Sequence, residues 1–272
     1  MKELTLREIW IYPVKSLGGI QMEKANAMGK GLEFDRRWML IDEHNMFMTQ
    51  RVHTQMAMFK LTLSDRNITV AKKNAERESA ITFSADSIPV GEKMRAKIWD
   101  DDVEVFEVDP GLSKWFSTHL KMSCRLVTFP EKNPRPVDPK YKVNNEHVSL
   151  ADAYPFLIIG QSSLDDLNTR LKEPVPMNRF RPNFVFTGGA PFEEDTWREF
   201  KIGDKRFVGV KPCARCVLTT VNQETGEKGI EPLFTLSTYR KREAKVLFGQ
   251  NLVGVDTGIV RVGDKISVEN HG

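Results

Sequence analysis

The chain has 272 residues, of which 40% are hydrophobic and 28% are charged, and this composition is typical of a globular protein with a buried core. Its 40 basic and 37 acidic residues give a formal net charge of +3, and no run of one sign is concentrated enough to indicate a nucleic-acid partner. The N-terminal stretch MKELTLREIWIYPVK lacks the apolar core of a secretory signal, and no segment approaches the roughly 18 uncharged apolar residues of a membrane-spanning helix, so we expect no membrane.

The first half of the chain predicts short strands separated by turns. Alternating or buried-type runs are found at 4–12, at 37–42 with a turn back into 46–49, at 59–63 with a hairpin turn into 68–70, and at 94–99 with a hairpin across 100–102 into 103–108. Meanders of this kind close into barrels or sandwiches.

Few helices are expected. Apolar residues between 112 and 120 share one helical face after Pro110, and Ser162 and Asp165 have the spacing of a capping box before a second helix. A third helix is predicted over 235–248. We therefore predict a mainly β fold with a few helices, an α+β class.

A proline-rich stretch interrupts this pattern between 130 and 139, where the prolines forbid both helix interiors and central strands. It predicts a domain boundary or a long surface connection. Residues 156–160 then predict a buried strand.

The chain has three cysteines, Cys124, Cys213 and Cys216. This number is too small, and odd, for a disulfide framework, so it favours a reducing compartment and reactive or ligand thiols. Cys124 stands in the strand-like segment SCRLVTF and is interpreted as an inert buried thiol.

Cys213 and Cys216 form a C-x-x-C pair in KPCARCVLTTV, which leaves several interpretations open. A structural zinc site needs two more soft or imidazole ligands, and the five histidines are scattered without paired spacing. A thioredoxin-type dithiol needs its first cysteine at a helix N-terminus, whereas the β-branched run after Cys216 indicates that the pair enters a strand.

A functional interpretation rests on the neighbours of Cys216. Lys211 and Arg215 lie close to it in sequence, and nearby cations favour the thiolate that attacks or ligates. Pro212 cannot donate a hydrogen bond to a sheet, so we expect the chain to lift off the ladder there and present the thiol outward.

Isolated cations beside turn-forming residues suit an anionic ligand. Lys15 and Ser16 precede two glycines whose backbone amides could approach a phosphate. Arg36 and Arg181 each stand just before a predicted strand, and the planar fork of arginine suits bidentate phosphate contacts.

Taken together, these segments resemble the MOSC family, in its branch of amidoxime-reducing components and their bacterial relatives. The matching features are IYPVKSLGGI, MGKGLEFDRRWMLID, ADAYPFLIIGQSSLDDLNTRL, NRFRPNFVFTGG, CARCVLTTVNQETG, EPLFTLSTYRK, LFGQNL and GIVRVGDKISV. The resemblance implies an N-terminal β-barrel-like unit over 1–122, a C-terminal MOSC β-barrel over 123–272, and a molybdenum cofactor of the molybdopterin type between them.

The resemblance also implies roles for individual residues. Cys216 would be the thiolate ligand of molybdenum and the catalytic residue. The other cofactor-binding positions that it implies are Lys15, Ser16, Arg36, Arg181, Ala214, Arg215 and Asn251. Ala153 and Tyr154 stand where eukaryotic relatives place a hydroxyl pair, so some cofactor contacts are expected to differ.

The implied activity is reduction of small N-hydroxylated substrates by oxygen-atom transfer to molybdenum. The chain begins at the domain itself without a membrane anchor, so it resembles a bacterial, cytoplasmic protein. No ferredoxin domain follows, so the electrons would come from a separate ferredoxin-, flavin- or cytochrome-type protein. Two alternatives stay open: a carrier that holds sulfur or cofactor on Cys216, and a degenerate barrel with no cofactor.

Overall fold

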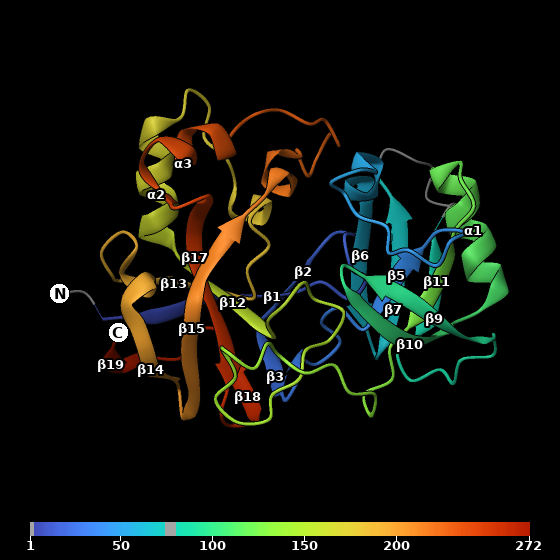
Figure 1. The fold of residues 1–272 in the computed structure, drawn as a ribbon, viewed down its shortest axis with the longest axis horizontal. Helices are drawn as coiled ribbons and strands as arrows, with labels where there is room; N and C mark the ends of the chain where they lie inside the picture. Colours follow the sequence, from blue (N-terminus) through green and yellow to red (C-terminus); the bar gives the residue numbers. More distant parts are fainter. Residues whose placement is uncertain (1–2, 74–79) are drawn as a thin grey trace.

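The computed structural model describes residues 3–73 and 80–272. In this part of the chain, two β-rich parts lie side by side, with the N-terminal half of the sequence forming most of one and the C-terminal half most of the other (Figure 1). The mainly β fold with a few helices, divided into an N-terminal and a C-terminal β-rich unit, is therefore confirmed.

The larger part is built on a nine-stranded sheet of the described residues, in the order β19-β14-β15-β17-β12-β13-β1-β2, with β16 paired to β17. Its strands are β1 (Thr5–Ile11), β2 (Ile20–Met22), β12 (Phe156–Gly160), β13 (Phe184–Thr187), β14 (Trp197–Ile202), β15 (Lys205–Arg215), β16 (Lys241–Arg242), β17 (Lys245–Gly254) and β19 (Ile266–His271). A small sheet is formed by β3 (Lys24–Met28), β4 (Gly31–Leu32) and β18 (Gly258–Arg261).

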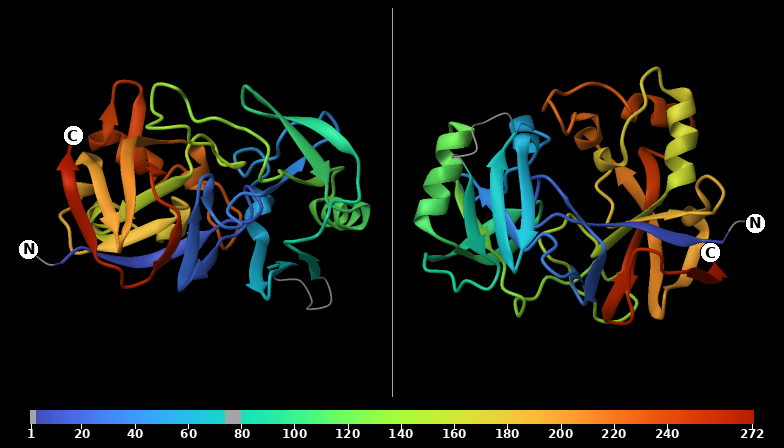
Figure 2. Two further views of the ribbon diagram at one scale, coloured as in Figure 1. Left: turned by 90° about the horizontal axis from the view of Figure 1, so that it is seen from below. Right: turned by 180° about the vertical axis from the view of Figure 1, so that it is seen from behind.

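The second part holds two further sheets. One has the order β5-β11-β10-β9, with β5 (Trp38–Ile41), β9 (Lys93–Ile98), β10 (Asp101–Glu107) and β11 (Arg125–Thr128). The other is formed by β6 (Phe59–Ser64), β7 (Asn67–Lys72) and β8 (Ile81–Ser84). The helix α1 (Pro110–Leu120) covers the outer side of this part, as the view from behind in Figure 2 shows.

Strand pairing crosses the predicted boundary between residues 122 and 123 in both directions. β1 pairs with β13 and β3 pairs with β18, so the first strands of the chain lie in sheets of the C-terminal half. β11 follows residue 123 but pairs with β5 and β10. The chain thus passes twice between the two parts, which brings segments from both halves to the junction between them.

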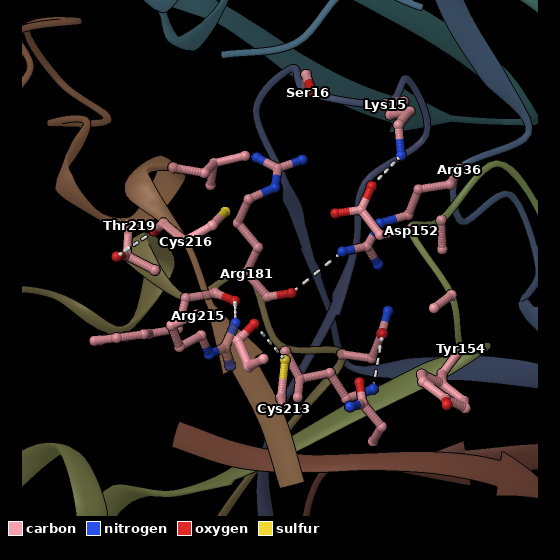
Figure 3. Close-up of a pocket in the computed structure, with 18 of the residues that line it drawn as sticks. Lys15, Ser16, Arg36, Asp152, Tyr154, Arg181, Cys213, Arg215, Cys216 and Thr219 are labelled. Atoms are coloured by element: carbon pink, nitrogen blue, oxygen red, sulfur yellow. Dashed lines mark hydrogen bonds and ion pairs between the residues drawn. The ribbon is translucent and has the colours of Figure 1, made fainter. Parts of the chain in front are cut away.

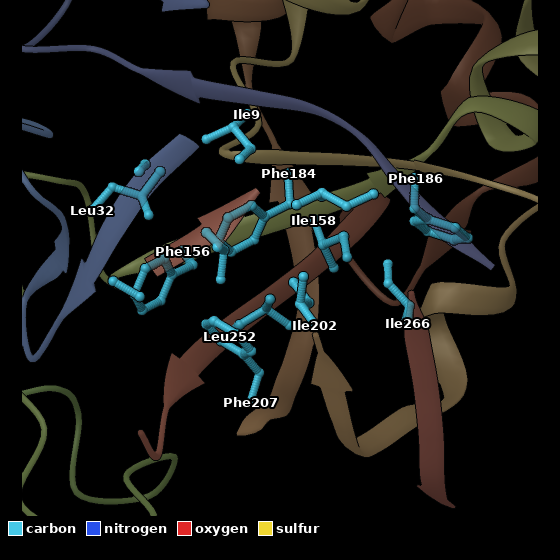
Figure 4. Close-up of a cluster of buried hydrophobic side chains, with 14 of the residues drawn as sticks. Ile9, Leu32, Phe156, Ile158, Phe184, Phe186, Ile202, Phe207, Leu252 and Ile266 are labelled. Atoms are coloured by element: carbon cyan, nitrogen blue, oxygen red, sulfur yellow. The ribbon is translucent and has the colours of Figure 1, made fainter. Parts of the chain in front are cut away.

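Buried aromatic side chains hold the larger part together. Phe156, Phe184 and Phe207 pack against one another, with ring centroids 5.4 to 5.7 Å apart, beside aliphatic residues from β1, β17 and β19 (Figure 4). Rings of this size contribute large buried apolar areas. This core fixes the sheet whose strand β15 leads into Cys216.

The predicted hairpins and the first helix are confirmed. The strands β6 and β7 pair from Phe59 to Lys72, and the Asp109 side chain caps α1 by accepting hydrogen bonds from the amides of Gly111 and Leu112. In the second hairpin Ile98 pairs with Asp101, so the turn contains only Trp99 and Asp100 rather than residues 100–102.

The predicted capping box is wrong. The helix α2 (Gln161–Arg170) begins directly after β12, with Gly160 at its N-cap position and no capping side chain of its own. The carboxylate of Glu194, which is buried, accepts hydrogen bonds from the Gly160 amide and from the Ser163 hydroxyl instead. A distant residue therefore satisfies donors at this helix start that Ser162 was expected to satisfy.

The third helix is shorter than predicted. The helix α3 (Leu233–Tyr239) ends before Arg240, and the chain then forms the tight hairpin of β16 and β17. Glu243 adopts a left-handed backbone conformation with φ of 53°, which a continuing α-helix does not allow. Among the described residues, no helix is long and apolar enough to cross a lipid bilayer.

Candidate functional site

A cavity of about 300 Å³ lies at the junction of the two parts. All the cofactor-binding residues implied by the resemblance line it: Lys15, Ser16, Arg36, Arg181, Ala214, Arg215, Cys216 and Asn251. Figure 3 shows several of these side chains around one space, carried by segments from both halves of the chain. Their clustering is a property of the tertiary structure, whereas their role in binding a cofactor stays a prediction.

Cys216 lies where β15 ends. The residue is half-buried and extended, and its carbonyl accepts hydrogen bonds from the amide and hydroxyl of Thr219, which closes a short 3-10 turn over 217–220. The prediction that the C-x-x-C pair enters a strand is therefore wrong. The threonines form local side-chain hydrogen bonds that favour the turn over a continuing strand.

The sheet is irregular before the thiol, as Pro212 predicted. The register of β15 against β17 shifts between Gly209 and Lys211 and again between Pro212 and Ala214. A proline has no amide hydrogen for the ladder, and bulges accommodate it. The second shift places Cys213 at a bulge, away from Cys216.

This geometry disfavours a dithiol. Ala214 and Arg215 are both paired in the sheet, so Cys213 and Cys216 are separated by about 10 Å of extended chain, more than the roughly 7 Å that a disulfide tolerates between Cα atoms. In the described part of the chain, no three His, Cys, Asp or Glu side chains are grouped to hold a metal ion, so the pair lacks the further ligands of a structural zinc site.

The cation at the Cys216 thiol is Arg51, not Lys211 or Arg215. Arg51 Nε lies 3.1 Å from Cys216 Sγ. Arg215 instead donates to the carbonyls of Phe180 and Phe248, at 3.0 and 2.8 Å, and Lys211 Nζ lies over the ring of Tyr141. The expectation that these sequence neighbours supply the cation is wrong, because both side chains have other partners.

Asp152 forms ion pairs with two cations of the cavity lining, Lys15 and Arg51. One of its carboxylate oxygens accepts from Lys15 Nζ at 2.6 Å, and the other accepts from Arg51 at 2.7 Å. Desolvation in the cavity by itself would raise the pKa of Asp152, but the charges of Lys15 and Arg51 outweigh it and hold this pKa well below its usual range. Burial lowers the pKa of Lys15 to about 8, although Asp152 opposes that shift.

Two arginines share one aromatic ring. The guanidinium carbons of Arg36 and Arg181 each lie 4.2 Å from the ring centroid of Tyr12, which is buried. Asp35 accepts two hydrogen bonds from Arg36, at 2.6 and 2.8 Å. Both arginines have left-handed backbones, with φ of 50° and 54°, a strained conformation for side chains of this size. Two like charges are thus held in place beside the cavity.

The two glycines after Ser16 have a different role from the one expected. The Gly18 amide already donates to the carbonyl of Phe59, and a Cβ at Gly18 would lie 2.6 Å from that oxygen. A Cβ at Gly19 would lie 2.6 Å from the Tyr12 ring. Close packing against the Phe59 carbonyl and the Tyr12 ring, rather than the approach of a phosphate, explains these residues.

Comparison with known proteins agrees with this architecture. Residues 3–123 match the MOSC N-terminal beta barrel domain, and residues 145–267 match the MOSC domain. The chain is 32% identical to mitochondrial amidoxime-reducing component 1 of Mus musculus over 96% of this chain and 81% of that protein. The chain belongs to the MOSC family. Mitochondrial amidoxime-reducing component 1 of Homo sapiens is 31% identical to this MOSC protein, over 96% of this chain and 82% of the human protein.

Two further comparisons give lower similarity. The molybdenum cofactor sulfurase of Arabidopsis thaliana is 28% identical over 90% of this MOSC protein but only 32% of its own length. The crystal structure of the YUAD protein from Bacillus subtilis has a TM-score of 0.41 and 11% identity over 98% of this chain and 97% of that one.

Three residues around the site of this MOSC protein were missed from the sequence: Arg51, Asp152 and Tyr12. Arg51 and Asp152 line the cavity, and Tyr12 lies behind it. Asp152 and Tyr12 each lie inside a segment that carried the family resemblance, but neither has a residue type that by itself indicates an anionic ligand. Arg51 follows Gln50 in a segment without any motif. Cys124 is buried as expected, and burial raises its pKa.

Proposed function

We propose that this protein binds a molybdenum cofactor in the cavity, through Cys216, and reduces N-hydroxylated compounds. The observation that carries the proposal is the composition of the cavity lining. Among the described residues that line it, seven are basic and one is acidic, and a half-buried thiol lies among them. Such a site suits an anionic ligand that contains a thiophilic metal.

The individual residues fit such a group. A thiolate is a soft ligand and suits a metal already held by sulfur. Arg215 Nη2 is buried without a hydrogen-bond partner in the protein, and a bound anion would satisfy it. Lys15, Ser16, Arg36 and Arg181 would hold the phosphate and pterin, and Ala214, Arg215 and Asn251 would lie beside the metal.

The reaction would consume one N-hydroxylated molecule, two electrons and two protons, and would release the reduced nitrogen compound and water. The cofactor would supply the oxygen-atom transfer, and a separate ferredoxin-, flavin- or cytochrome-type protein would supply the electrons. The protein itself would orient the cofactor and the substrate and would neutralise the negative charge of the cofactor. Arg51 would hold the Cys216 side chain in place through its Nε, while Asp152 fixes the guanidinium from its other side.

The names of the relatives support this proposal and also define its alternative. The mouse and human relatives are named as amidoxime-reducing components, and the plant relative is named as a molybdenum cofactor sulfurase. In the alternative, Cys216 carries sulfur or cofactor for delivery and does not take part in turnover. We also propose a bacterial origin and a cytoplasmic location.

The molybdenum content of purified protein tests the proposal. Wild-type protein, Cys216→Ser and Cys213→Ser would each be produced in cells that make the cofactor. We expect near-stoichiometric metal in the wild type and in Cys213→Ser and little in Cys216→Ser, together with reduction of an amidoxime by the wild type when a chemical reductant is supplied. Absence of metal from all three would contradict the proposal, and an added sulfur atom on Cys216 in the mass spectrum would favour the carrier.

A further inference from the structure

The proline-rich stretch over 130–139 carries a buried arginine, Arg135, that the proposed function does not use. Only 4% of Arg135 is exposed, and it is not among the described residues that line the cavity. A proline stands on either side of it, its amide donates to His147 Nδ1 at 3.0 Å, and its carbonyl accepts from the Val148 amide at 2.8 Å. A buried charge is costly unless its donors have partners, so the partners of this guanidinium indicate what it does.

The guanidinium of Arg135 binds three backbone carbonyls within four residues. Its Nη1 donates to the carbonyls of Ser149 and Ala151, at 2.6 and 2.5 Å, and its Nη2 donates to the carbonyl of Asp152 at 3.2 Å. Its Nε donates to the carboxylate of Asp101, in β10, at 2.9 Å. Residues 149–152 belong to no helix or strand, so the rigid, planar fork of Arg135 replaces the hydrogen bonds of regular structure there.

The same four residues contact three cations of the cavity lining. The Leu150 carbonyl accepts from Lys15 Nζ at 2.8 Å, and the Leu150 amide donates to the carbonyl of Arg36 at 2.9 Å. The Asp152 carboxylate accepts from Lys15 and from Arg51, and Figure 3 shows it facing Lys15. The position of this backbone segment therefore determines where these cations point.

We propose that Arg135 is a positioning residue of the site. By binding the carbonyls of 149–152, it holds the Asp152 carboxylate where this group orients Lys15 and Arg51 toward a ligand in the cavity. Only the identity of that ligand rests on the function proposed above, because the orientation of the two cations is a property of the protein itself. Partners that orient the groups around a metal site are often as important for its affinity as those groups.

A double-mutant cycle on the full-length protein tests the positioning without any ligand. Arg135→Lys keeps the charge, and with it the direct attraction to Asp152, but loses the planar fork. If Asp152 is then displaced from Lys15 and Arg51, Asp152→Asn should shift the urea midpoint less in the Arg135→Lys protein than in the wild type. A merely structural arginine would give equal shifts.

Arg240→Lys is the matched control for the cycle. Arg240 is also largely buried and ion-paired, to Asp195, and it is not among the described residues that line the cavity. Asp152→Asn should shift the urea midpoint equally in the Arg240→Lys protein and in the wild type.

The rate of molybdenum loss during dialysis gives a second measurement, which does not need the Asp152 variant. In protein from cells that make the cofactor, we expect Arg135→Lys to lose molybdenum about 10-fold faster than the wild type and Arg240→Lys to lose it at the wild-type rate. Equal midpoint shifts in the cycle, or equal rates of molybdenum loss in the two lysine variants, would overturn the inference. A wild type without molybdenum, together with unequal midpoint shifts, would overturn the proposed function alone.

Discussion

At the scale of single residues, the site is a set of charges that the protein has immobilised before any ligand arrives. Arg36 and Arg181 repel each other, yet the ring of Tyr12 lies within 4.2 Å of both guanidinium carbons. The faces of an aromatic ring are electronegative and attract cations, and Asp35 compensates one of the two charges. Tyr12 therefore positions two cofactor-binding candidates without lining the cavity itself.

This arrangement predicts different effects for two substitutions of Tyr12. Tyr12→Phe keeps the ring and loses only the hydrogen bond to the Pro182 carbonyl, so it should cost about 1 kcal/mol of stability and retain molybdenum. Tyr12→Leu removes the ring, so it should cost about 2–4 kcal/mol and lower the molybdenum content strongly. Elemental analysis and chemical denaturation would measure both effects.

Phe207→Leu provides the matched control, because Phe207 is a buried ring in the core of the larger part and does not line the cavity. It should lower stability by a similar amount and leave the molybdenum content unchanged. Equal metal loss in Tyr12→Leu and Phe207→Leu would show that general destabilisation explains the effect.

At the scale of elements, helix α2 depends on a carboxyl group that is far away in sequence. Glu194 is buried, and its carboxyl group accepts hydrogen bonds from the Gly160 amide and the Ser163 hydroxyl at the start of the helix. Burial raises the pKa of Glu194 from 4.5 to about 7. The folded state therefore binds this proton more tightly than the unfolded state.

This difference in the pKa of Glu194 between the folded and unfolded states predicts how the free energy of unfolding changes with pH. Because the unfolded state loses the Glu194 proton first, this residue's contribution to the free energy of unfolding should fall as pH rises from about 4.5 to about 7, by at most about 1.4 kcal/mol per pH unit. Glu194→Gln stays neutral and can still accept both hydrogen bonds, so its stability should depend less on pH over that window. Urea denaturation at pH 5, 6, 7 and 8 would compare the two proteins, and parallel curves would refute the prediction.

At the scale of the whole molecule, the two parts are joined by polar contacts around the cavity. Gln50 and Gln223 are both buried and exchange side-chain hydrogen bonds of 2.9 and 3.3 Å, and Gln50 also donates to the carbonyl of Ser16. Gln223 follows the turn after Cys216, so this pair connects the loop of the thiol to the N-terminal half.

Breaking this pair should therefore lower the stability of the protein. Gln223→Leu leaves the Gln50 side chain without one buried partner and should cost about 1–3 kcal/mol. In a double-mutant cycle with Gln50→Leu, measured by chemical denaturation, we expect the second substitution to cost less than it does alone, with a coupling energy of about 1 kcal/mol. Additive effects would indicate that the two amides do not act as a unit.

The sequence by itself predicted the β-rich class, the hairpins, the first helix and eight residues that the structure brings to one cavity. These features depend on local alternation, turn chemistry and a resemblance in motifs along the chain. The sequence did not predict the end of the third helix, the start of α2 or the partner of the Cys216 thiol. Only the tertiary structure decided these, because Glu194, Arg51 and Asp152 act on groups that are 31 to 165 residues away in sequence. Contacts over such separations arise when the sheets pack, and no local pattern encodes them.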